Sequence, residues 1–243
     1  MKSTARWVAV AALAFSTSAL ADTVTVSWSS PVFNPSPGDS ISWGGTSSAG
    51  TGSSSAGRFH GSITAFSGAI TASDFVDSTA NLWAYCYDLL QGLHNGTYTV
   101  QYSVNSRTLD FLGAVNYVLS GNSNTWLDSY AWLHSSDRNV TAAIQAGIWE
   151  SVYDTSGFDL ASGNFTLTGL EAASASAYAS FKAAVDNASV NDLPASLAMA
   201  FVNGDNQDVI TGRRPRQQVP EPGSLLLLGL GAAMAGWSLR RKR

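Results

Sequence analysis

The stretch LWAYCYDL, residues 82–89, holds the only cysteine of the 243-residue chain, and it decides how the rest of the sequence is interpreted. Its side chains alternate, with Leu82, Ala84 and Cys86 on one face, which is the period of a β-strand. A second stretch, AAIQAGIWE at 142–150, repeats its apolar residues at helical spacing instead. The two stretches predict a protein that combines strands with helices.

Further periodic segments flank these two stretches. Strand-like patterns occur at 23–28, 58–66, 97–104, 165–168, 197–202 and 208–211, and helical patterns occur at 109–119, 139–153 and 172–185. Asn203-Gly204-Asp205 is typical of a hairpin turn, and the Ser/Gly/Thr/Ala tract at 44–57 is typical of a flexible surface loop. The predicted fold class is α+β, an antiparallel β framework, sandwich-like or barrel-like, with inserted helices.

The N-terminus has the three-part layout of a secretory signal peptide. Lys2 and Arg6 precede an apolar stretch at 7–15, and small residues lead to Ala19-Leu20-Ala21, an A-x-A cleavage pattern. Residues 1–21 are therefore predicted to be removed on export. The folded domain is expected at 22–215.

The C-terminus carries a second targeting signal at 216–243. An uncharged run of 17 residues at 223–239 sits at the lower limit for a single transmembrane helix, and the basic residues that end the chain should stay cytoplasmic. This segment resembles the PEP-CTERM sorting signal through Pro220, Glu221, Pro222, Arg240, Arg241 and Arg243. The resemblance implies an exosortase-type sorting enzyme as a partner and a protein anchored in the inner membrane, facing the periplasm. After sorting it would reach the cell surface or the extracellular matrix.

The charge of the exported part argues against nucleic acid as a partner. Six of the 13 basic residues lie in the leader and the terminal cluster, which leaves seven against 17 acidic residues. Phosphate backbones are bound by clustered Lys and Arg, so a domain of this charge is not expected to bind them.

Few residues are candidates for chemistry. His60, His94 and His134 lack the close spacing of zinc ligands, and no phosphate-binding loop, dinucleotide fingerprint or nucleophile elbow is present. The sequence therefore predicts no metal and no cofactor.

Cys86 and Gln145 are the two residues that need an explanation. An unpaired cysteine in an exported protein is intermolecular, reactive or buried as a small apolar residue. On the predicted helix, Val140, Ile144, Ile148 and Val152 form the apolar stripe, and Gln145 falls between this stripe and Trp149. A buried primary amide costs about 1 to 3 kcal/mol unless it finds partners. Backbone hydrogen bonds or a covalent bond would each give Gln145 a reason to point inward.

The pair resembles the Cys-Gln thioester domains of bacterial surface proteins. The matching residues are Tyr85-Cys86-Tyr87 and Gln145-Ala146-Gly147-Ile148-Trp149, with Gly147 where the pattern usually has Ala. The resemblance implies a thioester between Cys86 and Gln145, which an external amine or hydroxyl would open. Tyr85, Tyr87, Ile148 and Trp149 would form the pocket that excludes water, and Tyr87 or His134 would assist proton transfer.

Three classes of function follow from these observations. The first is a surface or matrix-attachment protein that couples covalently through the thioester. The second is a structural or carbohydrate-binding protein of an exopolysaccharide or biofilm matrix, with the same fold and no thioester. The third, the least favoured, is a hydrolase that pairs Cys86 with His94 or His134.

Overall fold

A closed β-barrel forms one half of the molecule in the computed structural model, which describes residues 21–155 and 157–215. The barrel strands are antiparallel in the order β1-β4-β5-β9-β8-β6. Their bounds are β1 Thr23–Phe33, β4 Phe59–Ser67, β5 Leu82–Cys86, β6 Gly96–Gln101, β8 Ala198–Asn203 and β9 Asn206–Gly212. Alternating apolar residues such as Val24 and Val26 fill the interior, because side chains of a small barrel point inward at every second position. The antiparallel β framework is therefore confirmed in its barrel form.

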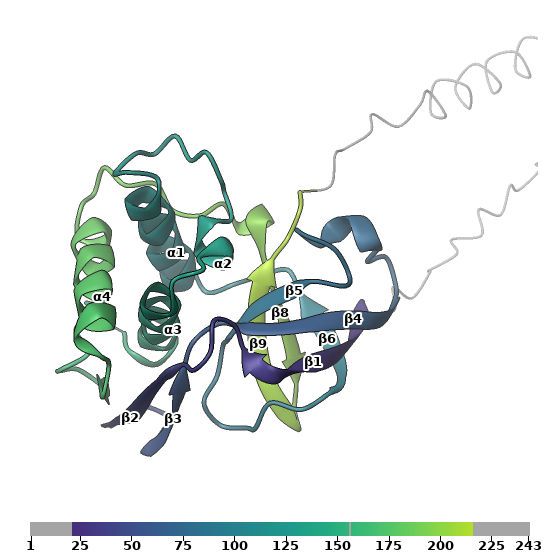
Figure 1. Ribbon diagram of the computed structural model, residues 1–243, viewed down its shortest axis with the longest axis horizontal. Helices are drawn as coiled ribbons and strands as arrows, with labels where there is room; N and C mark the ends of the chain where they lie inside the picture. Colours follow the sequence, from purple (N-terminus) through teal and green to yellow (C-terminus); the bar gives the residue numbers. More distant parts are fainter. Residues whose placement is uncertain (1–20, 156, 216–243) are drawn as a thin grey trace, which may run out of the picture.

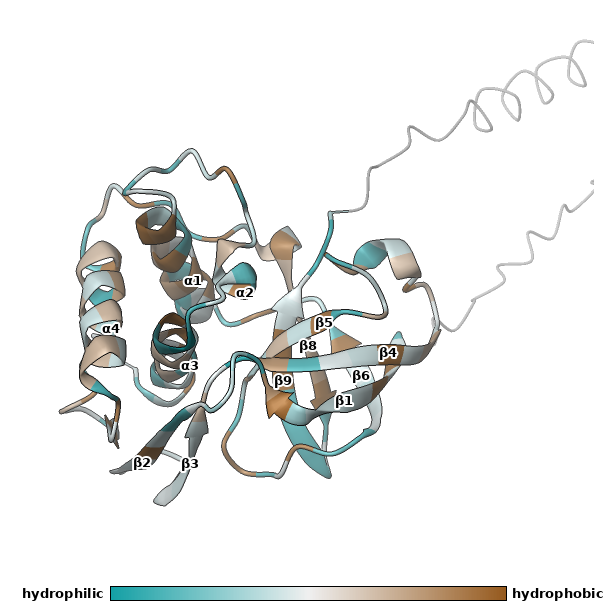
Figure 2. Cartoon of the chain, in the orientation of Figure 1, coloured by the Kyte–Doolittle hydropathy of each residue, from teal (hydrophilic) through white to brown (hydrophobic). Residues whose placement is uncertain are grey.

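The helices lie beside the barrel, as Figure 1 shows. Their bounds are α1 Ser106–Leu119, α2 Ala131–His134, α3 Arg138–Tyr153 and α4 Ala172–Val185, with short 3-10 helices η1 at Ala72–Asp74 and η2 at Ala195–Leu197. Asn105 caps α1 by accepting from Arg107 N at 2.9 Å, and Asp137 caps α3 by accepting from Asn139 N at 2.8 Å. In Figure 2 the colours along α4 are mostly pale, whereas α1 and α3 carry dark apolar segments.

Helix α3 is the central element of the fold. It packs against α1, α4, β5 and the small sheet described below, and every side chain from Thr141 to Ser151 is buried. The predicted stripe is too narrow, because Val140 and Val152 at its ends are only partly buried while the helix is covered on all sides between them. A helix buried on all sides is a core helix, so Gln145 has no solvent to turn toward.

A second sheet of three strands lies at one edge of the molecule. It has the order β3-β2-β7, with β2 at Asp39–Gly45, β3 at Gly52–Ala56 and β7 at Phe165–Thr168. The prediction of a loop at 44–57 is wrong at both ends. Gly44 and Gly45 end β2 and pair with β7, and β3 pairs with β2 in regular register from Asp39–Ala56 to Trp43–Gly52. Ile41 of β2 and Phe165 of β7 are buried, which joins this sheet to the common core.

The predicted targeting segments lie outside the described residues. This applies to the signal peptide, apart from Ala21 at its end, and to the transmembrane helix expected at 223–239. Within residues 21–155 and 157–215, no helix has the length and apolar character that crossing a bilayer requires.

Candidate functional site

Strand β5 extends beyond the end of its neighbour β4. On one side it pairs with β9 as far as Cys86, which lies opposite Val209. On the other side β4 begins only at Phe59, opposite Ala84, so no strand reaches Cys86 there. The backbone N–H and C=O of Cys86 on that side need another partner, because buried backbone groups are nearly always hydrogen-bonded.

Gln145 supplies that partner from helix α3. Its Oε1 accepts a hydrogen bond from Cys86 N at 2.8 Å, and its Nε2 donates to Cys86 O at 2.8 Å. The side-chain amide therefore pairs with Cys86 as a neighbouring strand would. Because Gln145 has no exposed surface, these two bonds also meet its own need for partners.

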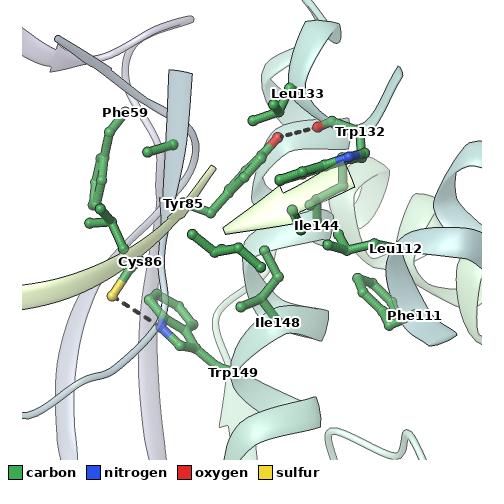
Figure 3. Close-up of a cluster of buried hydrophobic side chains, with 14 of the residues drawn as sticks. Phe59, Tyr85, Cys86, Phe111, Leu112, Trp132, Leu133, Ile144, Ile148 and Trp149 are labelled. Carbon is green, nitrogen blue, oxygen red and sulfur yellow. Dashed lines mark hydrogen bonds between the residues drawn. The ribbon is translucent and has the colours of Figure 1, made fainter. Parts of the chain in front are cut away.

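The Cys86 sulfur is enclosed by protein. The indole Nε1 of Trp149 donates to Cys86 Sγ at 3.2 Å, and the thiol donates to the backbone oxygen of Asp88. Figure 3 shows the sulfur pointing toward the Trp149 ring below the strand. Burial raises the pKa of the Cys86 thiol, and the Trp149 hydrogen bond opposes that rise. The thiol is thus neutral at rest, with a donor in place for a developing thiolate.

The predicted pocket residues divide into two groups. Trp149 and Ile148 are buried on α3, and Trp149 contacts the sulfur. Tyr85 points to the opposite face of β5, where its hydroxyl donates to Trp132 O at 3.0 Å and its ring stacks on Trp132 (Figure 3). The Tyr87 hydroxyl accepts from Asn105 N at 3.0 Å, next to the start of α1. The hydrogen bonds of Tyr85 and Tyr87 are thus directed away from the sulfur.

Gly147 is explained by the ring of Phe111 on α1. A Cβ at position 147 would lie 1.9 Å from Phe111 Cζ, closer than atoms can approach. Phe111 is itself fully buried and packs against Phe158, Tyr178 and Phe181. Glycine at position 147 therefore lets α1 and α3 pack closely behind Gln145.

Asp88 and Asp208 are site residues to which the sequence assigned no role. Oδ1 of Asp88 is buried and has no hydrogen-bond partner in the described part of the chain. Burial, followed by the nearby Asp208 carboxylate, raises the pKa of Asp88 to about 6. The position of Asp88 two residues after Cys86 was a local signal for it, but Asp208 arrives only through the β8–β9 hairpin.

Glu150 is a second unusual carboxyl, one residue after Trp149. It has no exposed surface, and neither of its oxygens has hydrogen-bonding geometry to a donor among the described residues. Burial, followed by the charge of Asp154, raises the pKa of Glu150 to about 8. Glu150 is therefore largely protonated at neutral pH.

The histidines lie elsewhere. His134 is placed between two carboxylates, with its Nε2 at 3.4 Å from Asp77 Oδ1 and its Nδ1 hydrogen-bonded to Asp128. The His94 ring lies against Gly92. Within the described ranges, neither ring is a hydrogen-bond partner of Cys86 Sγ, and no group of three or more His, Cys, Asp or Glu residues has the geometry of a metal site.

Comparison with known proteins identifies the C-terminal segment. Residues 218–243 match the family model of the PEP-CTERM protein-sorting motif, which confirms the predicted sorting signal. The motif implies export, membrane-associated sorting and processing by an exosortase. The search of curated proteins finds no match, and neither does the search of solved structures.

Proposed function

We propose that this exported protein attaches covalently to a surface or matrix target through an internal thioester between Cys86 and Gln145. One observation carries the proposal: the side-chain amide of Gln145 forms both its hydrogen bonds with the backbone of Cys86, the only cysteine. These residues are 59 positions apart in the chain, and each is at most 1% exposed. The sorting motif supplies the route to the surface on which such a bond would be useful.

Bond formation needs no cofactor. Sγ of Cys86 attacks Cδ of Gln145, the C–N bond breaks, and the thiol proton leaves with the nitrogen as ammonia. The N–H of Cys86 already donates to Oε1 of Gln145 at 2.8 Å, so it would stabilise the negative charge that develops on this oxygen. The Trp149 indole would stabilise the attacking sulfur in the same step.

The surroundings favour survival of the thioester. Cys86, Gln145 and Trp149 are all buried, and exclusion of water slows hydrolysis of a reactive acyl group. When an amine or hydroxyl of the target reaches Cδ, a new C–N or C–O bond forms, the C–S bond breaks, and the proton of the nucleophile passes to the Cys86 sulfur. The target then remains bonded to Gln145.

The composition limits self-reaction. Lys182 is the only lysine between the leader and the basic tail. It lies on α4, where its Nζ is 2.9 Å from Asp186 Oδ2. Intramolecular amines are thus scarce, so an activated thioester would persist until a target arrives.

The second candidate function is non-covalent. The same two hydrogen bonds complete the β5 edge without any reaction, and the raised pKa of Cys86 slows attack. In that case the domain would be a structural or carbohydrate-binding component of the matrix, and the same sorting signal would deliver it there.

Methylamine labelling separates the two functions. The purified exported protein is incubated with methylamine, digested and mapped by mass spectrometry. The thioester predicts an adduct on Gln145 with release of a free Cys86 thiol, and it predicts no adduct in Cys86→Ser or Gln145→Glu, which keep the shape of the site. An unlabelled Gln145 in a correctly folded wild-type protein would reject the covalent function.

A further inference from the structure

The charged groups beside the site define which nucleophiles can approach it. We propose that Asp88 and Asp208 make the entrance to the Cys86–Gln145 site selective for positively charged reactants over negatively charged ones. This inference rests on the proposed function, since it assigns a charge preference to that same site.

A polar groove of about 400 Å³ lies along β6 and the β8–β9 hairpin. Gln91, Thr97, Thr99, Asn203 and Asp208 line it, and no lysine or arginine is among its lining residues. Oε1 of Gln91 is buried there without a hydrogen-bond partner in the described ranges. The groove therefore offers acceptor oxygens and negative charge, with no cation to neutralise them.

Asp208 lines this groove and also lies next to the β9 residue that pairs with Cys86. It precedes Val209, the strand partner of Cys86, and its backbone oxygen accepts from Tyr87 N at 2.7 Å. Its Oδ1 accepts from Asn203 N at 2.8 Å, which holds the carboxylate at the groove. The charges of both Asp208 and Asp88 act on the Cys86 thiol.

Asp88 stands on the segment that covers the sulfur. Its backbone oxygen accepts from the thiol, so this segment has to move before a reactant can reach Cys86. The following residues, 89–94, are held by Leu89 N to Tyr153 Oη at 2.9 Å, by Gln91 Nε2 to Gly204 O at 3.1 Å and by Gln207 N to Gly92 O at 3.0 Å. His94 O also accepts from Trp28 and Tyr98, whereas Leu90 between these anchors is 61% exposed. Helix α3 is buried throughout its centre, so we assign the opening motion to this exposed loop.

A reactant that enters under the loop would pass Asp88, whose backbone oxygen accepts from the thiol, and Asp208, which precedes the strand partner of Cys86. With a pKa of about 6, Asp88 is ionised at pH 8. Each carboxylate interacts with a passing unit charge by roughly the thermal energy. Two of them therefore make the reaction rate of a cationic probe about tenfold or more higher than that of an anionic probe.

The first experiment uses the thiol of the wild-type exported protein. If the protein contains the thioester, methylamine is added first to release the Cys86 thiol. If it contains none, the native Cys86 thiol is used directly. At pH 8 and low ionic strength, its rate of modification is measured with a cationic trimethylammonium-ethyl methanethiosulfonate and an anionic sulfonatoethyl methanethiosulfonate. Each rate is divided by that of neutral methyl methanethiosulfonate.

We expect the cationic reagent to be favoured by about tenfold, and raising the salt from 0.01 M to 1 M should remove most of the preference, because the Debye length falls from about 30 Å to about 3 Å. Asp88→Asn combined with Asp208→Asn should also remove it. The matched control, Asp110→Asn with Asp192→Asn, changes the net charge equally at a different surface depression and should keep the preference.

The result that overturns the inference is an equal normalised rate for both charged reagents, or a preference that the Asp88 and Asp208 changes leave intact. A second measurement compares cadaverine with 6-aminohexanoate as openers of the thioester, since they differ in the charge of the far end. Failure of all amines to open the protein rejects the proposed function, whereas equal opening by both amines rejects only the charge selectivity.

Discussion

The protonation of Glu150 gives the sharpest test of the packing around α3. Its carboxyl is fully buried, and its pKa is raised from 4.5 to about 8, first by burial and then by Asp154, with the backbone of Asp159 partly opposing this rise. A group whose pKa is higher in the folded state stabilises the fold fully at pH values below its unfolded pKa. That contribution is lost as the pH rises through the folded pKa.

The magnitude follows from the size of the shift. Each pKa unit corresponds to about 1.4 kcal/mol, so a rise from 4.5 to about 8 gives an upper limit near 5 kcal/mol, and about 3 kcal/mol falls in the interval between pH 5.5 and 8. Glu150→Gln keeps the shape of the side chain and cannot ionise. Its free energy of unfolding should therefore lose this part of the pH dependence, while other raised carboxyls such as Asp88 still contribute equally to both proteins.

Urea denaturation followed by tryptophan fluorescence measures the effect between pH 5.5 and 8. The wild-type protein should lose about 3 kcal/mol more stability than Glu150→Gln over this range. Asp186→Asn is the control, because it removes an exposed carboxylate and should leave the wild-type slope unchanged. Parallel curves for wild type and Glu150→Gln would refute the assignment of a buried, neutral Glu150.

Three further predictions test other parts of the account. Gly147→Ala should lower the free energy of unfolding by about 1 to 3 kcal/mol, because its Cβ would overlap the Phe111 ring; thermal denaturation measures this, and an unchanged melting temperature would contradict the close packing of α1 on α3. Trp149→Phe should leave the protein folded but lower the fraction of chains that form the thioester and release ammonia, since it removes the donor to Cys86 Sγ. Mass spectrometry of freshly made protein measures that fraction, and equal fractions in the variant and the wild type would show that the indole has no role. Asp137→Ala should cost about 1 kcal/mol through loss of the α3 N-cap, whereas Asp137→Asn should cost less; chemical denaturation compares the two, and equal losses would argue against capping.

Much of the architecture could be predicted because the local patterns are strong. Segments with clear alternation or helical spacing became β1, β4, α3 and α4, and Ala172–Val185 was predicted with its observed bounds. The resemblance to Cys-Gln thioester domains predicted that Cys86 and Gln145 lie together, and the Gln145 amide does bond to the backbone of Cys86. The covalent bond itself stays a prediction.

The missed features depend on tertiary contacts. Strand β3, with the sequence GSSSA, has almost no apolar residues, so its pairing with β2 leaves no periodic signal. Closure of the barrel depends on the β1–β6 pairing, which joins residues far apart in the chain. Asp208 reaches the site only because the β8–β9 hairpin brings it there, and the directions of Tyr85 and Tyr87 follow from their contacts with Trp132 and Asn105.

The mass of the intact, untreated exported protein tests the central proposal most directly. A thioester between Cys86 and Gln145 predicts a mass short of the sequence mass by one ammonia, and it predicts the full mass for Cys86→Ala. A wild-type protein at its full sequence mass, with Cys86 unmodified in the folded state, would contradict the covalent function and leave Gln145 as the non-covalent partner of the β5 edge.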